Sequence, residues 1–418
     1  MNSFFGKLWK NKRGNALLIA GAALPLVIGS AGLASDTIQW VLWKRQLQRA
    51  ADSAAIAGVY AKVLGNSQSD AITTDLTKNQ NTGYSLLTGY PQISNPAVAN
   101  TTNTVRVVLA IQQPLSFSGM FLTSAPTIQA SATAATVQTG AYCVVSLEPT
   151  ATTGITATGN STLNLGCGMI TNSTSLNAAI ATGSSEVHAT PVAAVGDIQS
   201  SSHWNGAELL PFTVAEADPF AGVNVPSFTG CQGGSNAFND HVHDVTNWTA
   251  DTGIHCVSSM NVQGTLNLGS ATYVIDGGSF TANSQAVINC TGCTIVFTNS
   301  SSSTTATIGG ISNINGSAQL NMTAPTSGNF NGILFYQDRR ATAGSIDSIN
   351  GNSSSTFSGA MYFPNQQLDV NGNSGLNFTC AQFVAKDVSF SGNGTINNTC
   401  AAGYGNTNIM GRHVRLVA

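Results

Sequence analysis

Two histidines are the first candidates for metal chemistry. His241 and His243 lie in NDHVHDV and would point to the same side of a strand. With Asp240 or His255 they could hold zinc or copper. No third ligand has the fixed spacing of a metal site, so an ordinary structural loop is the favoured interpretation and no metal is predicted.

Clustered carboxylates would be needed for acid and base catalysis on a polysaccharide. The densest group is Asp338-Arg339-Arg340 with Asp347, in QDRRATAGSID, and a salt-bridged turn explains it better than a catalytic site. The other acidic residues are scattered, and the sequence has no phosphate-binding glycine loop or nucleophile elbow. We predict no catalytic residues, no cofactor and no enzyme activity.

The eight cysteines all lie between Cys143 and Cys400. An even number confined to one region, behind an export-type segment, predicts disulfides in an oxidising compartment, and buried free thiols are the alternative. Cys290 and Cys293 have the spacing of a redox pair, but their flanks are strand-like, which favours structural bonds. The predicted pairs are Cys143–Cys167, Cys231–Cys256, Cys290–Cys293 and Cys380–Cys400.

The N-terminal region contains an uncharged run of nineteen residues from Ala16 to Ala34, which is a candidate membrane-spanning helix. As a helix it would be about 28 Å long, close to the hydrocarbon thickness of a bilayer. Pro25 and Gly32 lie inside the run, and the proline would only kink it. Basic residues precede it, so the positive-inside rule places the N-terminus in the cytoplasm. They are Lys7, Lys10, Lys12 and Arg13.

The segment that follows favours an anchor over a cleaved signal peptide, although Gly32-Leu33-Ala34 would suit a signal peptidase. TIQWVLWKRQLQRAADSAAIAGVYAK contains no helix breaker before Gly58, which predicts one helix from about Asn15 to Leu64. An apolar seam on it predicts a partner helix or bundle. The seam consists of Trp40, Trp43, Leu47, Ala50, Ala54, Ala57 and Ala61.

Trp40 and Trp43 have two interpretations. They would lie just beyond the membrane, where indole rings favour the interface, or they make ordinary core contacts.

The N-terminal segment resembles TadE/TadG-like proteins of tight-adherence (Flp) pilus systems. The shared features are Arg13-Gly14, Pro25 within the apolar run, Gly32 with Asp36, and the helix Arg49 to Ala55. Pilin-like members cut by prepilin peptidase carry Glu five residues after the cleaved glycine. Here that position is Ile19, so the resemblance implies an uncut, TadG-type anchored protein.

Residues 65–140 are predicted to form a small α/β stalk, because 104–111 and 127–137 alternate as strands between prolines. From 141 to 405 a motif of an apolar residue, a spacer and Gly before Asn, Ser or Thr recurs, with glycines 21 and 20 residues apart at Gly351, Gly372 and Gly392. Such a period indicates coils of a β-helix, and an irregular sandwich is the alternative. Residues 406–418 are predicted to be a C-terminal tail.

The predicted fold is therefore mainly β: residues 1–64 form a cytoplasmic tail, a transmembrane helix and its projecting continuation, and the stalk and a right-handed parallel β-helix-like body follow. The resemblance to TadG-like proteins extends to this body, and the metal-binding Asp-x-Ser-x-Ser loop of other members is missing.

These features predict a structural role in the cell envelope. Only 8% of the residues are charged and the body is mildly acidic, which argues against nucleic acid as a partner. The expected protein is a single-pass inner-membrane component of Flp pilus assembly with its body periplasmic or extracellular. Its expected partners are TadE/TadF-like proteins or a second copy through the seam, and surface polysaccharide for the body. The alternatives are a surface adhesin and a carbohydrate-active β-helix enzyme.

Overall fold

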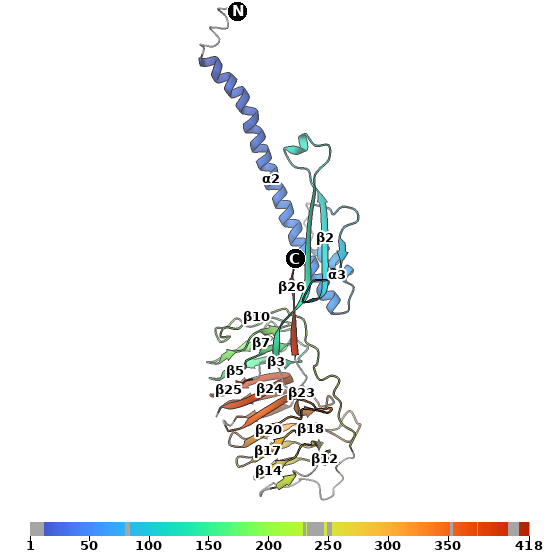
Figure 1. Cartoon of the computed structure of the whole chain (residues 1–418), viewed down its shortest axis with the longest axis vertical. Coiled ribbons are helices and arrows are strands. Elements are labelled where there is room, and N and C mark those ends of the chain that lie inside the picture. Colours follow the sequence, from blue (N-terminus) through green and yellow to red (C-terminus); the bar gives the residue numbers. More distant parts are fainter. Residues whose placement is uncertain are drawn as a thin grey trace, which may run out of the picture. The chain divides into compact units, whose positions relative to one another are not determined.

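The computed structural model describes residues 12–79, 84–228, 231, 246–248, 253–351, 354–373, 375–399 and 409–417. The chain divides into two compact units (Figure 1). Unit 1 comprises Met1–Val137 with Val414–Ala418, and unit 2 comprises Gln138–His413. The long helix and the expected stalk thus form one unit, and the expected C-terminal tail contributes a strand to the fold.

Unit 1 is built on one long helix, α2 (Lys12–Val63), which continues through Pro25. Its second half packs against a short helix, α3 (Gln68–Lys78), and against a β-hairpin. The hairpin consists of β2 (Thr101–Gln112) and β3 (Thr127–Ser146), with β1 (Gln92–Ser94) added antiparallel to β2. The single helix predicted over 15–64 and the strands predicted at 104–111 and 127–137 are confirmed.

The hairpin runs alongside α2, and contacts along its length show this. Lys62 Nζ contacts Thr104 O near one end, and Asp36 contacts Ser118 at the other. Between these ends Gln48 Nε2 donates to the Ser131 carbonyl at 2.9 Å. The closing loop of the hairpin, which contains the 3₁₀ turn η1 (Ser118–Met120), therefore lies at the end of the hairpin nearer the N-terminus (Figure 1).

Unit 2 is a parallel β-helix-like body whose described strands form three stacks, to which most coils contribute one strand each. Strands in each stack pair in parallel with the coil above and below. We name the first stack the asparagine face. It consists, in spatial order, of β11 (Thr246–Trp248), β14 (Thr265–Leu268), β17 (Val287–Thr291), β20 (Gln319–Thr323), the first parts of β23 (Thr356–Asn371) and β24 (Leu376–Ser391), β25 (Thr395–Asn398), β5 (Thr162–Asn164) and β8 (Glu186–His188).

The other two stacks share the long strands β23 and β24 with the first. The second consists of β12 (Ile254–Val257), β15 (Thr272–Asp276), β18 (Thr294–Thr298), β21 (Ile333–Gln337), β23, β24, the end of β3, β6 (Gly168–Thr171), β9 (Val192–Ala194) and β10 (Leu209–Leu210). The third consists of β13 (Met260–Val262), β16 (Phe280–Ala282), β19 (Ile311–Ile314), β22 (Ile346–Asn350), β23, β24, β4 (Ile155–Ala157) and β7 (Ala179–Ala181). The last strand, β26 (Ile409–Leu416), runs from unit 2 into unit 1.

Inward side chains of successive coils form the core of the body. Phe357 contacts Phe378 at 5.5 Å between ring centroids, Phe378 contacts Phe383 at 4.9 Å, and Phe383 contacts Phe390 at 5.6 Å. The repeated glycine has a backbone role at Gly159 and Gly392, which both adopt positive φ and stack turn on turn. A Cβ on Gly159 would meet the Gly392 carbonyl.

The coils are not stacked in the order of the chain. The last long strand, β24, pairs with β3 and β4, so the last coil in the sequence stacks on the first coil. The first three coils therefore form one end of the body, and β11 begins at the other (Figure 1). Between them the chain returns along the body, where Asp218 accepts a hydrogen bond from Tyr362. The sequence repeat did not indicate this reversal.

The disulfides follow the predicted pattern. Cys143–Cys167, Cys231–Cys256 and Cys290–Cys293 are bonded, with Cα atoms 5.8, 5.5 and 6.0 Å apart. Cys380 is also disulfide-bonded, while its predicted partner Cys400 lies outside the described residues.

Candidate functional site

The clearest site in unit 1 lies where the apolar run of α2 ends. Asp36 is buried, and its carboxylate accepts hydrogen bonds from the backbone N–H groups of Phe117 (2.8 Å) and Ser118 (2.6 Å). Burial raises the pKa of Asp36, but the hydrogen bonds from Ser118 and Phe117 outweigh this and hold the pKa below its ordinary value. The ionised carboxylate therefore fastens the hairpin loop to the helix.

Two neighbours on the same helix face complete this attachment. Gln39 Nε2 donates to Ser116 Oγ at 2.7 Å, and Gln39 Oε1 accepts from the Ser116 backbone N–H at 3.3 Å. Gly32, one turn before Asp36, lies under the Phe117 ring, and a Cβ there would overlap the ring. Glycine in an exposed helix lowers stability by roughly 1 kcal/mol relative to alanine. The close contact with the Phe117 ring explains why glycine nevertheless occupies position 32. We call Gly32, Asp36 and Gln39 the loop clamp.

The predicted helix-packing seam is buried within the chain, and this corrects the expectation that a TadE/TadF-like protein or a second copy packs there. Leu47, Ala50, Ala54 and Ala61 are buried within the chain, because α2 packs on α3 and β2. The small side chains did indicate a close neighbour, but the neighbour is the chain's own hairpin and short helix. Ala57 is half-buried.

The two tryptophans differ in environment. Trp43 makes an edge contact with Tyr84 at 6.2 Å between ring centroids, as in the core interpretation. Trp40 is 41% exposed, as in the interface interpretation. Pro25 and Ala34 lie within α2 with their side chains exposed, and the side chain of Ala16 lies outside the described part.

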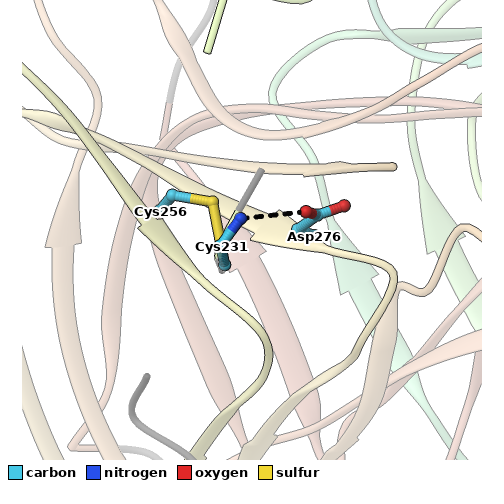
Figure 2. Close-up of side chains that lie close together, drawn as sticks. All are labelled: Cys231, Cys256 and Asp276. Carbon is cyan, nitrogen blue, oxygen red and sulfur yellow. Dashed lines mark hydrogen bonds between the residues drawn. A yellow bond between two sulfur atoms is a disulfide. The ribbon is translucent and has the colours of Figure 1, made fainter. Parts of the chain in front are cut away.

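Among the residues that the structure describes, one group has metal-ligand composition; it is formed by Cys231, Cys256 and Asp276 in unit 2 (Figure 2). The two sulfurs are bonded to each other, so no thiolate is available as a ligand. Asp276 accepts from the backbone N–H groups of Cys231 at 3.2 Å and Ser300 at 2.7 Å. These contacts join the chain before β11 to the coil structure. His241 and His243 lie outside the described residues.

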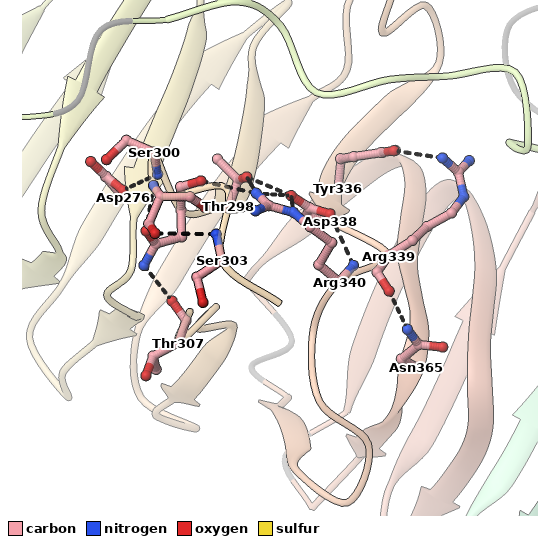
Figure 3. A network of polar contacts seen from close by, with 12 residues as sticks. Asp276, Thr298, Ser300, Ser303, Thr307, Tyr336, Asp338, Arg339, Arg340 and Asn365 are labelled. Atoms are coloured by element: carbon pink, nitrogen blue, oxygen red, sulfur yellow. Dashed lines mark hydrogen bonds and ion pairs between the residues drawn. The ribbon is translucent and has the colours of Figure 1, made fainter. Parts of the chain in front are cut away.

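The carboxylate cluster at Asp338 is an internal ion-pair network (Figure 3). Arg340 contacts Asp338 Oδ2 at 2.8 Å and donates to the carbonyls of Asn299 and Ser301, and Thr298 donates to Asp338 at 2.7 Å. Burial raises the pKa of Asp338, but the bonds from Arg340 and Thr298 outweigh it and lower the pKa overall. This is the salt-bridged turn that the sequence favoured.

The side chains of Arg339 and Asp347 have other partners than this ion pair. Arg339 pairs with Asp218 at 3.4 Å and holds the returning segment. Asp347 is 1% exposed and accepts from the Ile311 backbone N–H at 2.6 Å. Burial raises the pKa of Asp347 to about 7.

The sequence did not indicate a further acidic pair, Glu148 and Asp387, beside Lys386. Burial raises the pKa of Glu148, but bonds from Thr150 and Lys386 outweigh it, so its pKa is lowered overall. Burial and the Glu148 charge raise the pKa of Asp387 to about 6. Divergent pKa values are typical of acid–base pairs. Glu148, however, is 1% exposed and is held by Lys386 at 3.2 Å and Thr150 at 2.7 Å.

The asparagine face carries a ladder of amide hydrogen bonds between coils. Asn289 donates to Asn267 at 2.8 Å, and Asn321 donates to Asn289 at 3.0 Å. Asn397 bonds Asn377 and Asn164 in the same way. A cavity of about 630 Å³ opens beside this ladder. Its lining includes Asn164, His188, Asn205, Asn377 and Asn397 and no carboxylate.

One helix among the described residues, Ile19–Val63, is long and apolar enough to cross a membrane, and almost none of its apolar window is buried. The structure thus defines a class: a long helix with an apolar first half, built into a small α/β unit, and followed in the chain by a parallel β-helix-like body.

Residues 14–61 match the family model described as putative Flp pilus-assembly TadE/G-like. The chain therefore has the TadE/G-like N-terminal segment that its motifs predict, which supports a role in Flp pilus assembly. No curated protein and no solved structure matches the chain.

Proposed function

We propose that the chain is a membrane-anchored structural or accessory protein of Flp pilus assembly. The observation that carries the proposal is that the TadE/G-like segment coincides with one helix, α2, which continues from the apolar run into the packed part of unit 1. A cleaved signal peptide would lose this continuity. The helix therefore anchors the chain and also belongs to its folded structure.

The proposed topology has a single pass through the bacterial inner membrane, a cytoplasmic N-terminus and a periplasmic or extracellular body. The basic residues before the apolar run support this orientation. The disulfides of unit 2 support an oxidising compartment for the body. Resistance to alkaline carbonate extraction tests the anchor, and a soluble periplasmic form starting near Ser35 would overturn it.

We propose a structural rather than an enzymatic role for the body. Asp338, Glu148 and Asp347 are engaged by arginine, lysine, hydroxyl or backbone donors, and the lining of the cavity beside the asparagine face includes no carboxylate. The proposed partners are other pilus-assembly proteins of the TadE/TadF-like kind. Their contacts lie outside the buried seam positions.

A surface adhesin is the second candidate, favoured by the asparagine face and its cavity. Amide side chains in a regular array with a cavity beside them suit a neutral hydrogen-bonding ligand such as a surface polysaccharide.

A deletion strain tests these candidates directly. In the assembly role, deletion abolishes surface pili counted by electron microscopy, and the full chain restores them. A chain whose residues 1–34 are replaced by a cleavable signal peptide does not restore them. Normal pili with lost attachment in the deletion strain would overturn the assembly role and favour the adhesin.

A further inference from the structure

The hairpin loop held by the clamp ends in an exposed apolar tip. Met120 is 79% exposed, Phe121 73% and Leu122 52%. These three large side chains are consecutive, and Phe117 at the base of the loop contacts Phe121 at 5.3 Å between ring centroids. Single exposed apolar residues are normal on a protein, but a contiguous patch marks a site of interaction.

The position of this tip along α2 indicates what it contacts. The loop clamp attaches the loop at Gly32, Asp36 and Gln39, and the uncharged run of the helix ends at Ala34. Asp36 is about 3 Å of helix rise beyond Ala34. The loop is therefore held at the level where the helix passes from apolar to polar residues.

The composition of the hairpin agrees with this position. No Asp, Glu, Lys or Arg occurs between Arg106 and Glu148, so the distal half of β2, the whole loop and all of β3 are uncharged. The helix face beside the loop carries one charge, Asp36, whose carboxylate is buried against the loop backbone. Beyond it the helix is uncharged until Lys44, which contacts the Gln129 carbonyl further down the hairpin. A charged segment would resist transfer into the interfacial region of a bilayer, whereas this one would not.

We propose that the loop 113–126 is a second membrane contact, in which Met120, Phe121 and Leu122 insert into the interface of the leaflet that α2 leaves. This inference rests on the proposed anchoring of α2. The clamp then has a mechanical role: two contacts, one spanning and one interfacial, fix the tilt and rotation of unit 1 at the membrane. A single helix would leave both free.

The test uses the full chain reconstituted in vesicles of phosphatidylcholine and phosphatidylglycerol. An environment-sensitive fluorophore is attached to Met120→Cys, and lipids carrying spin labels at shallow and deep positions serve as quenchers. The described cysteines include no free thiol, so the introduced one is the intended attachment point under non-reducing conditions. Leu26→Cys, 75% exposed in the run, is the membrane control. Ser94→Cys is the aqueous control, because Ser94 pairs with Arg106, about 20 Å of strand before Gln112, where β2 ends and the loop begins.

We expect a fluorophore at position 120 to show blue-shifted emission and strong quenching by the shallow label. A fluorophore at position 26 should be quenched by the deep label, and one at position 94 should not be quenched. Quenching at Leu26 with Met120 behaving like Ser94 overturns the loop insertion and leaves the anchor intact. Absence of quenching at both Leu26 and Met120 overturns both. A tip that serves a protein partner instead would also show no quenching at Met120, since these vesicles contain only this chain.

A pair of glycine substitutions tests the clamp. Gly32→Ala displaces Phe117, and Gly29→Ala, where a Cβ would meet nothing within 4 Å, is the matched control. Quenching at Met120 is expected to fall in Gly32→Ala and to remain in Gly29→Ala. Equal quenching in both variants would show that the loop inserts without the clamp and would overturn the role given to Gly32.

Discussion

Asp36 Oδ1 accepts the backbone N–H of Phe117 at 2.8 Å, which joins the end of the apolar helix to a loop 81 residues later in the chain. The glycine and aspartate of the TadE/G-like motif therefore have a structural explanation. Gly32 leaves space for the Phe117 ring. The Asp36 carboxylate accepts hydrogen bonds from the backbone N–H groups of Phe117 and Ser118, where the turn of the loop begins.

Asp36→Ala should release the loop. Both amides lose their carboxylate acceptor, so hydrogen-exchange protection of the Phe117 and Ser118 amides should fall. Thr37→Ala is the matched control, because the Thr37 hydroxyl bonds only the Leu33 carbonyl of its own helix among the described contacts. Unchanged protection in Asp36→Ala would mean that the carboxylate does not hold the loop.

Ala54→Asp should unfold unit 1. Ala54 is fully buried between α2 and its neighbours, and placing an unpaired carboxylate there costs several kcal/mol. Arg49→Asp places the same charge on the exposed side of the helix and should be tolerated. Limited proteolysis of the detergent-solubilised chain measures the difference. Equal resistance of the two variants would contradict the packing of this helix face within the chain.

The disulfides should stabilise unit 2 unequally. In the chain-entropy model, closing a loop of about 25 residues contributes about 3.5 kcal/mol and closing a loop of about four contributes about 2 kcal/mol. Replacing Cys143 and Cys167 together by alanine should therefore lower the urea midpoint more than replacing Cys290 and Cys293. Both pairs are buried, so the packing losses are comparable. The reverse order would show that the entropic difference does not decide their effects.

Local signals in the sequence predicted much of this structure. The uninterrupted helix over 15–64 follows from the absence of breakers, and the separation of 24 residues between Cys143 and Cys167 matches adjacent coils. Alternating apolar residues located β2 and the start of β3. Each of these features depends on residues close together in the chain or one coil apart.

Features set by long-range packing were not predicted. The buried stripe from Leu47 to Ala61 showed that α2 has a close neighbour but not which one, because alanine accepts a helix or a strand equally well. The pairing of β24 with β3 and β4 has no signature in the repeat, since every coil has similar inward residues. The stretch between Arg106 and Glu148 is uncharged, but this composition alone did not indicate that its loop lies beside Asp36.

Asp347 should make the stability of unit 2 depend on pH. Its pKa of about 7 lies above the ordinary 3.8 because the carboxyl is buried, so the folded state retains a proton that the unfolded state loses. Below pH 4 both states are protonated and the site costs little. As the pH rises from 4 to 7 the unfolding free energy falls, by about 4 kcal/mol for this difference in pKa, and above 7 it levels off.

Asp347→Asn keeps an acceptor for the Ile311 N–H and should remove this part of the pH dependence. Urea unfolding at pH 4.5 and 7.5 measures it, with the exposed Glu208→Gln as control. If Asp347→Asn and the unsubstituted chain lose the same stability between these two values, the carboxyl titrates normally in the fold and its burial does not govern its ionisation.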